Sequence, residues 1–406
     1  MSEVYLGRQP ILDRNIRIFG YELLFRDREE NFAVIKDSIE ATARVVMNLL
    51  TYMDFKEIIN NKKGFINVSP EFLEGDFIDL LPENRIVLEI STLDKINKFV
   101  LDSISKVKEK GYQVALDNVQ FNELLTPLLE IVDYVKINIR NFSDIELKEI
   151  VDFLKKYSVK TIAVKVETEK DFLFTKELGF DYFQGFFFEK PTIKKEKKLP
   201  SYKLALLKVV KYAILEKSIE EISELIKGYP DLGYKLLRYV NSPYFYLRNK
   251  VHSIKQALSI LGYSNIQKWA ILQLFASEGG DIKSNPLLER AVIRGKMMEI
   301  LVSKITSNID QIEKAYITGM ISLIGSVLYR PLEEILNELY IDEEIKKAVL
   351  QNEGVLGSLL ASIIDLEKDN IEEARKKLES VRLGLEDLLS AELEAITYYE
   401  NFMESN

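Results

Sequence analysis

The sequence contains no cysteine and one histidine, His252, among its 406 residues. Without cysteine, the chain can form neither a disulfide nor a thiolate metal site, and it has no cysteine nucleophile. With one histidine, it cannot build a metal centre that needs two or more imidazoles. A metal site would therefore use oxygen ligands, which suit Mg²⁺, Mn²⁺ or Ca²⁺. Because His252 directly precedes Ser253, a candidate helix cap, we expect it at a helix start and assign it no site role.

The sequence also lacks a long apolar run and an excess of basic charge. No stretch approaches the ~20 apolar residues of a membrane span, and the opening "MSEVYLGRQP" lacks the apolar core of a signal peptide. The net charge is −9, from 55 basic and 64 acidic residues, which argues against non-specific binding to nucleic acid. We therefore expect a cytoplasmic protein without a membrane or nucleic-acid partner.

The first half of the chain alternates short apolar runs with helical patterns. Strands that are apolar nearly end to end are typical of a parallel sheet covered on both faces. Seven or eight such units indicate a closed (β/α) barrel. The predicted strands are 16–26, 64–69, 85–91, 113–118, 133–139, 160–166 and 181–188.

The pattern changes at "EKPTIKKEKKLPS", where two prolines flank a lysine-rich run typical of a solvated linker. After it, nearly every segment has helical spacing. Ser253 and Ser264 each stand three residues before a glutamine, which is the pattern of a capping box. We therefore predict an α/β barrel followed by an all-α domain, with the barrel at 1–191, the linker at 192–200 and the helical domain at 201–406.

Polar residues end or follow most of the predicted barrel strands. The carboxyl ends of the strands meet at one face of a (β/α) barrel, which is the reactive face of this architecture. One polar residue at a strand end is commonly a loop anchor, but eight on successive strands favour a site. Three carboxylates and an amide oxygen among them can converge on one hard cation. These residues are Glu22, Asn67, Glu89, Asp117, Lys136, Asn138, Glu167 and Gln184.

The motifs of this half resemble the EAL-domain cyclic di-GMP phosphodiesterases. Gln9-Pro10-Ile11 and "ELLFR" (22–26) stand where that family has a Gln-Pro-Ile and its Glu-Ala-Leu-x-Arg segment. "INVS", "LEIST", "ALDN", "VKIN", "AVKVET" and "FQGFFFEKP" follow in the family's order. The resemblance covers about residues 4–191 and implies a barrel that binds cyclic di-GMP and divalent metal.

The resemblance implies a role for each matching position. One divalent cation, Mg²⁺ or else Mn²⁺ or Ca²⁺, would be held by Glu22, Asn67, Glu89 and Asp117. Lys136 matches a lysine beside the attacking water and is the residual catalytic candidate. The implied ligand contacts are Gln9, Arg26, Lys136, Glu167 and Gln184.

Four positions depart from the family's catalytic pattern. Asn118 and Asn138 stand where the family has aspartates, and Thr92 stands where it has a glutamate. Val164 replaces the candidate general base. The two asparagines remove two charges from the cage of a second metal ion. A general base typically contributes ~10²–10⁴-fold to the rate, and valine cannot accept a proton, so we expect hydrolysis to be lost or weak.

The segment 236–276 resembles an HDOD domain, an output module related to HD-type phosphohydrolases, through "YVNSPYF", "SIKQALSILG" and "KWAILQLFA". This resemblance covers about 200–390. HD enzymes use several histidines, so this chain cannot assemble their metal site. We interpret the aromatic residues of the segment as core packing, with a partner-binding surface as the alternative. They are Tyr239, Tyr244, Phe245, Tyr246 and Trp269.

We therefore predict a bacterial signalling protein with a catalytically degenerate EAL barrel and an HDOD output domain that acts through protein–protein contacts. The prediction leaves open whether the barrel binds cyclic di-GMP. Two alternatives also stay open, namely a weak single-metal cyclic di-GMP phosphodiesterase and an adaptor that binds no nucleotide. EAL barrels often dimerise, so the resemblance also implies a homodimer.

Overall fold

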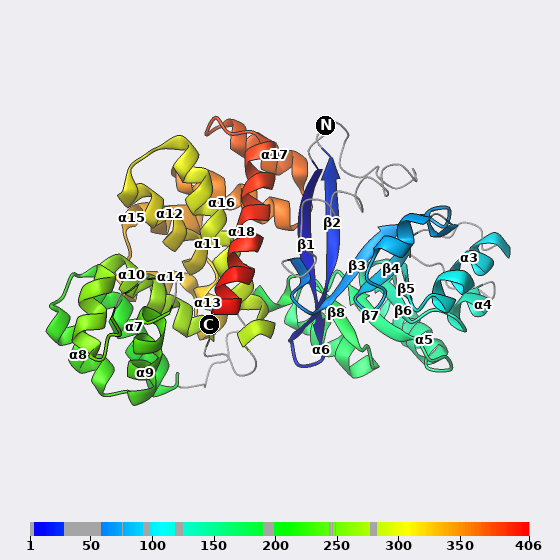
Figure 1. Ribbon diagram of the computed structural model, residues 1–406, viewed down its shortest axis with the longest axis horizontal. Helices are drawn as coiled ribbons and strands as arrows, with labels where there is room; N and C mark the ends of the chain where they lie inside the picture. The colour runs from blue at the N-terminus through cyan, green and yellow to red at the C-terminus, as the bar shows by residue number, and fades with distance from the viewer. Residues whose placement is uncertain are drawn as a thin grey trace. The chain divides into compact units, whose positions relative to one another are not determined.

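The computed structural model describes residues 4–27, 58–74, 76–91, 98–117, 125–189, 199–242, 245, 247, 249–276 and 282–405. The chain divides into two compact units, Met1–Lys190 and Pro191–Asn406. The first contains the strands, and the second is helical (Figure 1).

The first unit is a closed barrel whose strands neighbour one another in the order β1 to β8. Each strand from β2 to β7 is parallel to the next, whereas β1 is antiparallel to both β2 and β8. The strands are β1 Val4–Asp13, β2 Ile18–Asp27, β3 Lys63–Val68, β4 Ile86–Ser91, β5 Gln113–Asp117, β6 Tyr134–Asn138, β7 Lys160–Val164 and β8 Tyr182–Gln184.

The predicted barrel is confirmed with one correction, because β1 is absent from the predicted strands and breaks the parallel order. A parallel pair needs a crossover of a dozen or more residues, whereas β1 and β2 are joined by four residues, 14–17. The Asp13 carboxylate closes this turn by accepting hydrogen bonds from the N–H groups of Asn15 (2.8 Å) and Arg17 (2.9 Å). The short connection therefore makes β1 antiparallel.

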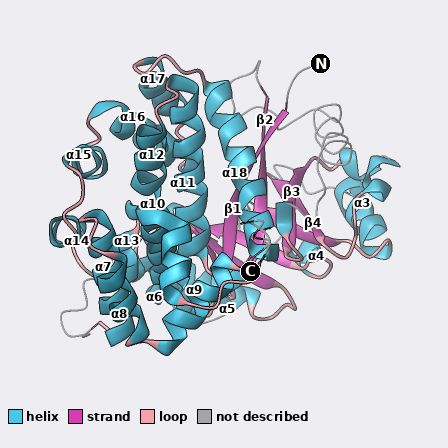
Figure 2. Cartoon of the chain, turned by 60° about the vertical axis from the view of Figure 1, so that its left-hand side comes forward, coloured by secondary structure: helices cyan, strands magenta, loops and turns pink. Residues whose placement is uncertain are grey.

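Helices cover the outside of the barrel strands (Figure 2). Helix α5 buries residues at spacings of three and four, the amphipathic pattern of a surface helix, namely Leu147, Ile150, Val151 and Leu154. Gly111, in a left-handed conformation (φ 94°), follows α3 and ends the helix in the way that glycine commonly does. The helices are α3 Lys98–Glu109, α4 Thr126–Leu129, α5 Asp144–Leu154 and α6 Glu169–Leu178, with 3₁₀ turns η1 Phe72–Glu74, η2 Asp76–Leu80, η4 Ile139–Asn141 and η5 Phe187–Glu189.

The second unit is helical throughout its described residues. Its elements are α7 Ser201–Ile214, α8 Ile219–Lys227, α9 Pro230–Val240, α10 Ile254–Ala276, η7 Ile282–Ser284, α11 Pro286–Ile305, α12 Ile309–Ile321, α13 Ile324–Leu328, α14 Leu332–Glu338, α15 Glu343–Gln351, α16 Gly354–Glu367, α17 Ile371–Glu379 and α18 Leu385–Ser405.

One of the two predicted caps in this unit is present. Ser253 Oγ accepts a hydrogen bond from the Gln256 N–H (3.1 Å) at the start of α10. The prediction at Ser264 is wrong, because its Oγ is buried without a hydrogen-bond partner. The interruption in α10 lies instead at Gly262, whose φ of 69° and ψ of 168° are not helical.

The aromatic residues of this unit are partly in the core, as we interpreted them. Trp269 is fully buried, and Tyr239 packs edge-on against Phe245 with ring centroids 5.1 Å apart. Tyr244 and Tyr246 lie outside the described residues. His252 is exposed in the loop before α10.

A buried ion pair joins two helices of the second unit. The Arg294 guanidinium of α11 donates from Nε to Glu367 Oε1 (2.9 Å) and from Nη2 to Glu367 Oε2 (2.6 Å) on α16. Arg290 lies 3.5 Å from the same carboxylate. Burial opposes ionisation of Glu367, but Arg294 and then Arg290 outweigh it and hold its pKa below the ordinary value.

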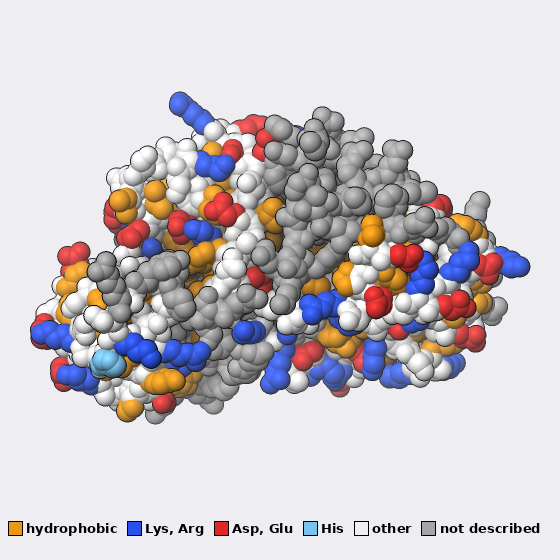
Figure 3. All heavy atoms as spheres, viewed as in Figure 1, with side chains coloured by type: hydrophobic (Ala, Val, Ile, Leu, Met, Phe, Trp, Pro, Cys, Tyr) orange, Lys and Arg blue, Asp and Glu red, His pale blue; other side chains and the backbone are white. Residues whose placement is uncertain are grey.

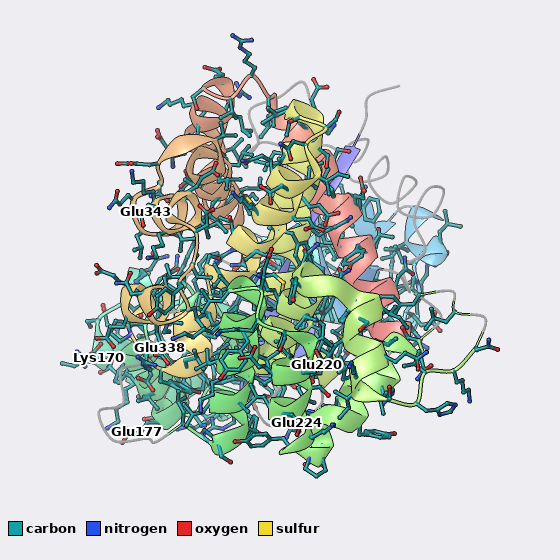
Figure 4. All side chains as sticks on the ribbon, turned by 90° about the vertical axis from the view of Figure 1, so that its left-hand side faces the viewer. Lys170, Glu177, Glu220, Glu224, Glu338 and Glu343 are labelled. Carbon is teal, nitrogen blue, oxygen red and sulfur yellow. The ribbon has the colours of Figure 1, made fainter. Side chains whose placement is uncertain are left out.

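The surface of the chain carries both signs of charge. Acidic and basic side chains are interspersed on the face turned to the viewer in Figure 3. On the helical unit, Glu224 of α8, Glu338 of α14 and Glu343 of α15 are exposed (Figure 4).

Within the described residues, one stretch, Glu343–Glu367, is long and apolar enough to cross a membrane by length and composition alone. It forms two helices, α15 and α16, with Asn352 between them in a left-handed conformation (φ 57°). It is weak evidence for a membrane span, because buried core helices of water-soluble proteins pass the same test.

Candidate functional site

The barrel strands bring the predicted site residues together in one layer at the mouth, the end of the barrel at which the parallel strands terminate. Below this layer the interior is filled by apolar and aromatic side chains, among them Phe65, Val87, Ala115, Tyr134, Ile162 and Tyr182. Side chains alternate between the two faces of a strand, so the residue two positions further on points inward again, nearer the mouth.

On each strand from β3 to β8, the residue two positions after the core residue belongs to the layer at the mouth. In β1, which runs the other way, the step goes back from Ile11 to Gln9, and Gln9 pairs in register with Glu22 of β2. We call the resulting set the mouth ring: Gln9, Glu22, Asn67, Glu89, Asp117, Lys136, Val164 and Gln184.

Lys136 is the centre of the ring's hydrogen bonds. Its ammonium donates to Glu22 Oε2 (2.9 Å) and to Glu89 Oε1 (2.7 Å). The exposed fractions of the three side chains are 2% for Lys136, 12% for Glu22 and 0% for Glu89. The three charges therefore interact with little screening by solvent.

Two amides complete the contacts of Glu22. Gln184 Nε2 donates to Glu22 Oε2 (2.6 Å) and to Gln9 Oε1 (2.8 Å), and Asn67 Nδ2 donates to Glu22 Oε1 (3.3 Å). The backbone next to Gln184 approaches that of Val166 closely at Gly185. A Cβ on Gly185 (φ 148°) would lie 2.0 Å from the Val166 carbonyl oxygen, so glycine is required at this close approach.

The two glutamates of the ring differ in electrostatics. Burial raises the pKa of Glu89 well above its ordinary value, and the favourable charge of Lys136 does not outweigh burial together with the carboxylates of Glu22 and Asp117. Burial also opposes ionisation of Glu22, but Lys136 and the amide donors lower its pKa overall. The pKa of Lys136 is raised, because Glu22 and Glu89 outweigh burial. The ring thus places three carboxyl groups around one ammonium.

Two buried oxygens of the ring, Glu89 Oε2 and Gln184 Oε1, have no hydrogen-bond partner. A buried acceptor without a partner costs ~1–3 kcal/mol, so these oxygens indicate a site for a cation or another donor. Carboxylate and amide oxygens also suit a hard divalent cation. As the side chains stand, however, the described residues contain no group of three His, Cys, Asp or Glu spaced to hold a metal ion.

Val164 differs from the rest of the ring, because it is the one apolar member and packs against the barrel core. Asn138 also serves local structure, since its Oδ1 accepts a hydrogen bond from the Arg140 N–H (3.0 Å) at the start of η4. Neither side chain is thus placed as a free proton acceptor beside Lys136.

Beyond the ring, the loop after β7 is fixed by a capping box in which Thr168 and Asp171 satisfy each other's backbone N–H groups. Glu167 lies in this loop, and its N–H donates to Asp171 Oδ2 (3.1 Å). Arg140, after β6, forms an ion pair with the same carboxylate. Burial would raise the pKa of Asp171, but hydrogen bonds from Thr168 and Arg140 lower it overall.

Three predicted positions cannot be placed in this site. Thr92 and Asn118 lie outside the described residues. Arg26 belongs to β2, and its side chain also lies outside the described part of the chain.

Comparison with known protein families decides the identity of both units. Residues 2–191 match the family model of the EAL domain, and residues 198–357 match that of the HDOD domain. The chain joins an EAL domain to an HDOD domain. Both resemblances seen in the sequence are confirmed.

Two relatives match this chain over nearly its whole length. The uncharacterized protein YuxH of Bacillus subtilis is 28% identical over 99% of this chain and 99% of its own. The cyclic di-GMP phosphodiesterase CdgJ of Vibrio cholerae is 27% identical over 97% of this chain and 92% of its own. Among solved structures, EAL enzyme Bd1971 in its cAMP- and cyclic di-GMP-bound form is 20% identical, with a TM-score of 0.38, over 46% of this chain and 62% of that one.

The contacts that sequence reasoning missed in the EAL domain are those between distant residues. Lys136 is separated by 114 residues from Glu22 and by 47 from Glu89. The signal that could have found them is the barrel's period of two, which aligns these positions once the strand register is known. No local motif marks the Arg140–Asp171 pair.

Proposed function

We propose that the EAL domain binds cyclic di-GMP together with one divalent cation and does not hydrolyse it efficiently. The chain then acts in the cytoplasm as a signal-transduction protein, with the HDOD domain passing the signal on through protein contacts. The observation that carries this proposal is the composition of the mouth ring, in which Val164 is apolar while its neighbours retain metal- and phosphate-binding chemistry.

The cation would be held by Glu22, Asn67, Glu89 and Asp117, whose oxygens are the ligands that Mg²⁺ and Ca²⁺ prefer. The ring has three carboxylates and one ammonium, so one divalent cation would bring it to neutrality. A second divalent cation would add two uncompensated charges, because Asn118 and Asn138 bring none. When bound, the cation would polarise a phosphate oxygen and lower the pKa of a bound water.

The ligand's phosphates would be bound by Lys136 and Arg26, since each supplies a positive charge and several donors. Gln9 and Gln184 would add amide contacts, which their hydrogen bond to each other already orients. Glu167, in the loop after β7, is the remaining proposed ligand contact.

Loss of turnover follows from the missing proton acceptor. A general base must lie within hydrogen-bond reach of the proton that it removes, and its loss typically costs ~10²–10⁴-fold in rate. Val164 has no acceptor atom, and the Asn138 oxygen is engaged in its own turn. Binding depends on other members of the ring and is therefore retained.

The HDOD domain supports an output role through protein contacts, because the chain's one histidine excludes the metal site of the HD enzymes. Protein partners and a homodimer belong to the proposal. Size-exclusion chromatography with light scattering tests the dimer.

Calorimetric titration of the full-length protein with cyclic di-GMP, with and without Mg²⁺ or Ca²⁺, tests binding. We expect heat of binding that depends on the cation and is lost in Glu22→Ala. No heat in any condition would leave the nucleotide-independent adaptor as the function.

Chromatography for the linear dinucleotide after incubation with Mn²⁺ tests hydrolysis. The relative CdgJ is named a cyclic di-GMP phosphodiesterase, so a weak phosphodiesterase is the alternative, and clear turnover abolished by Glu22→Ala would establish it. Conversely, Val164→Glu should introduce the missing acceptor and raise turnover, whereas the matched Val164→Gln, which has a similar shape without a carboxylate, should not.

A further inference from the structure

The Lys136 ammonium bridges two of the residues that would hold the divalent cation. Its Nζ lies 2.9 Å from Glu22 Oε2 and 2.7 Å from Glu89 Oε1. Divalent cations bind such oxygens at ~2.0–2.6 Å, so an ion shared by the same two oxygens would take nearly the position of Nζ. Two cations cannot lie there together, because they would overlap and repel each other.

We propose that Lys136 is a built-in counter-ion that a divalent cation must displace from Glu22 and Glu89, so that this lysine sets the metal affinity of the EAL domain. The inference rests on the proposed function, since it concerns the same cation site. The displacement would explain why the described residues contain no preformed group of three carboxylates that could hold a metal, although the donor types suit one.

The ring is arranged to allow this exchange. The ammonium contacts one oxygen of each glutamate and leaves Glu89 Oε2 and Gln184 Oε1 without partners. A cation with six or more oxygen ligands can satisfy more of these oxygens than the three N–H groups of a lysine. The exposed fraction of Gln184 is 1%, so ordinary solvent contact does not replace that partner.

The side chain of Lys136 can move when a cation displaces it. Its four-carbon stem is flexible, so the ammonium can leave both glutamates.

The experiment is a Mn²⁺ titration of the full-length protein without nucleotide, with free Mn²⁺ measured by electron paramagnetic resonance. Wild type is compared with Lys136→Met and with the control Lys160→Met. Lys160 begins β7, pairs with Asp181 at 3.0 Å and has a 58% exposed side chain, so the control removes the same charge away from the ring.

We expect Lys136→Met to bind Mn²⁺ about tenfold or more tightly than wild type, and Lys160→Met to match wild type. Equal Mn²⁺ affinity in Lys136→Met and wild type would overturn the displacement while leaving the proposed function intact. No Mn²⁺ binding by either protein would instead overturn the cation site on which both proposals rest.

A second measurement uses the wild-type protein and does not depend on how well Lys136→Met folds. In a crystal structure with Ca²⁺ bound, Nζ of Lys136 should lie beyond hydrogen-bond distance of Glu22 or Glu89. A bound Ca²⁺ with both lysine contacts intact would contradict the proposal.

Discussion

Removal of the buried carboxylate of Glu367 should strongly destabilise the HDOD domain. The exposed fractions of the side chains are 4% for Arg294 and 5% for Glu367, and their two short hydrogen bonds are of the bidentate kind. Glu367→Gln would remove the charged carboxylate that the buried Arg294 and the half-buried Arg290 both approach. Breaking a buried pair by removing one partner costs about 3–5 kcal/mol.

An exposed ion pair with a similarly short contact provides the control. Glu373 and Lys376 on α17 are 2.6 Å apart, but their side chains are 57% and 67% exposed. Exposed ion pairs contribute little to stability, so Glu373→Gln should leave the unfolding curve almost unchanged. The comparison isolates burial, since both variants replace a glutamate with its amide.

Trp269 makes this measurement specific to one domain, because it is the chain's one tryptophan and is fully buried in the HDOD domain. If the urea m value is ~2–3 kcal/mol/M, the midpoint seen by tryptophan fluorescence should fall by about 1–2 M in Glu367→Gln. Equal midpoints in Glu367→Gln and Glu373→Gln would refute the reasoning from burial.

The same pair predicts a pH dependence. The pKa of Glu367 in the folded protein lies below its ordinary value of 4.5, so its contribution is present above that value and is lost as the pH falls through the folded pKa. Between those two pKa values the wild type should lose stability on acidification. Glu367→Gln should lose less over the same interval.

Three further predictions concern the EAL domain. In metal-free protein, Lys136→Met should lower thermal stability, measured by far-UV circular dichroism, and Ca²⁺ should restore more of it than in wild type. Asp171→Asn should cost about 1 kcal/mol at neutral pH through loss of the carboxylate that completes the capping box and pairs with Arg140, and it should flatten the loss of stability below the ordinary pKa of aspartate, because the folded pKa of Asp171 is lowered. Gly185→Ala must displace the Val166 backbone, so cyclic di-GMP binding measured by calorimetry should weaken while the Trp269 unfolding transition stays unchanged.

The sequence predicted the EAL barrel well where local patterns carry the information. Apolar runs mark β2 to β8, and a polar residue near most of the strand ends marks the mouth ring, because both patterns lie within single strands. The direction of β1 is not visible in this way, since alternation looks the same in parallel and antiparallel strands. It follows from the tight turn at 14–17.

The contacts within the ring could not be predicted from the sequence. Residues such as Glu22 and Lys136 meet only through the closure of the barrel and the strand register, which depend on long-range pairing. Their roles in binding metal and ligand, like the predicted domain boundaries at 191 and 200, stay predictions. In the HDOD domain, Ser264 shows the same limit, because a buried environment outweighs its local capping pattern.

The architecture of the mouth ring explains how binding and hydrolysis can separate. Each strand contributes its own member of the ring, so a replacement on β7 need not disturb the residues on β2, β4 and β5 that would hold the cation. Val164 packs against the barrel core, while Glu22, Glu89 and Asp117 are acidic groups whose charge would destabilise the interior unless Lys136 or a cation balanced it. A barrel kept only as a scaffold would be more stable with apolar residues at these positions. The presence of Glu22, Glu89 and Asp117 beside the apolar Val164 therefore supports the proposed binding site.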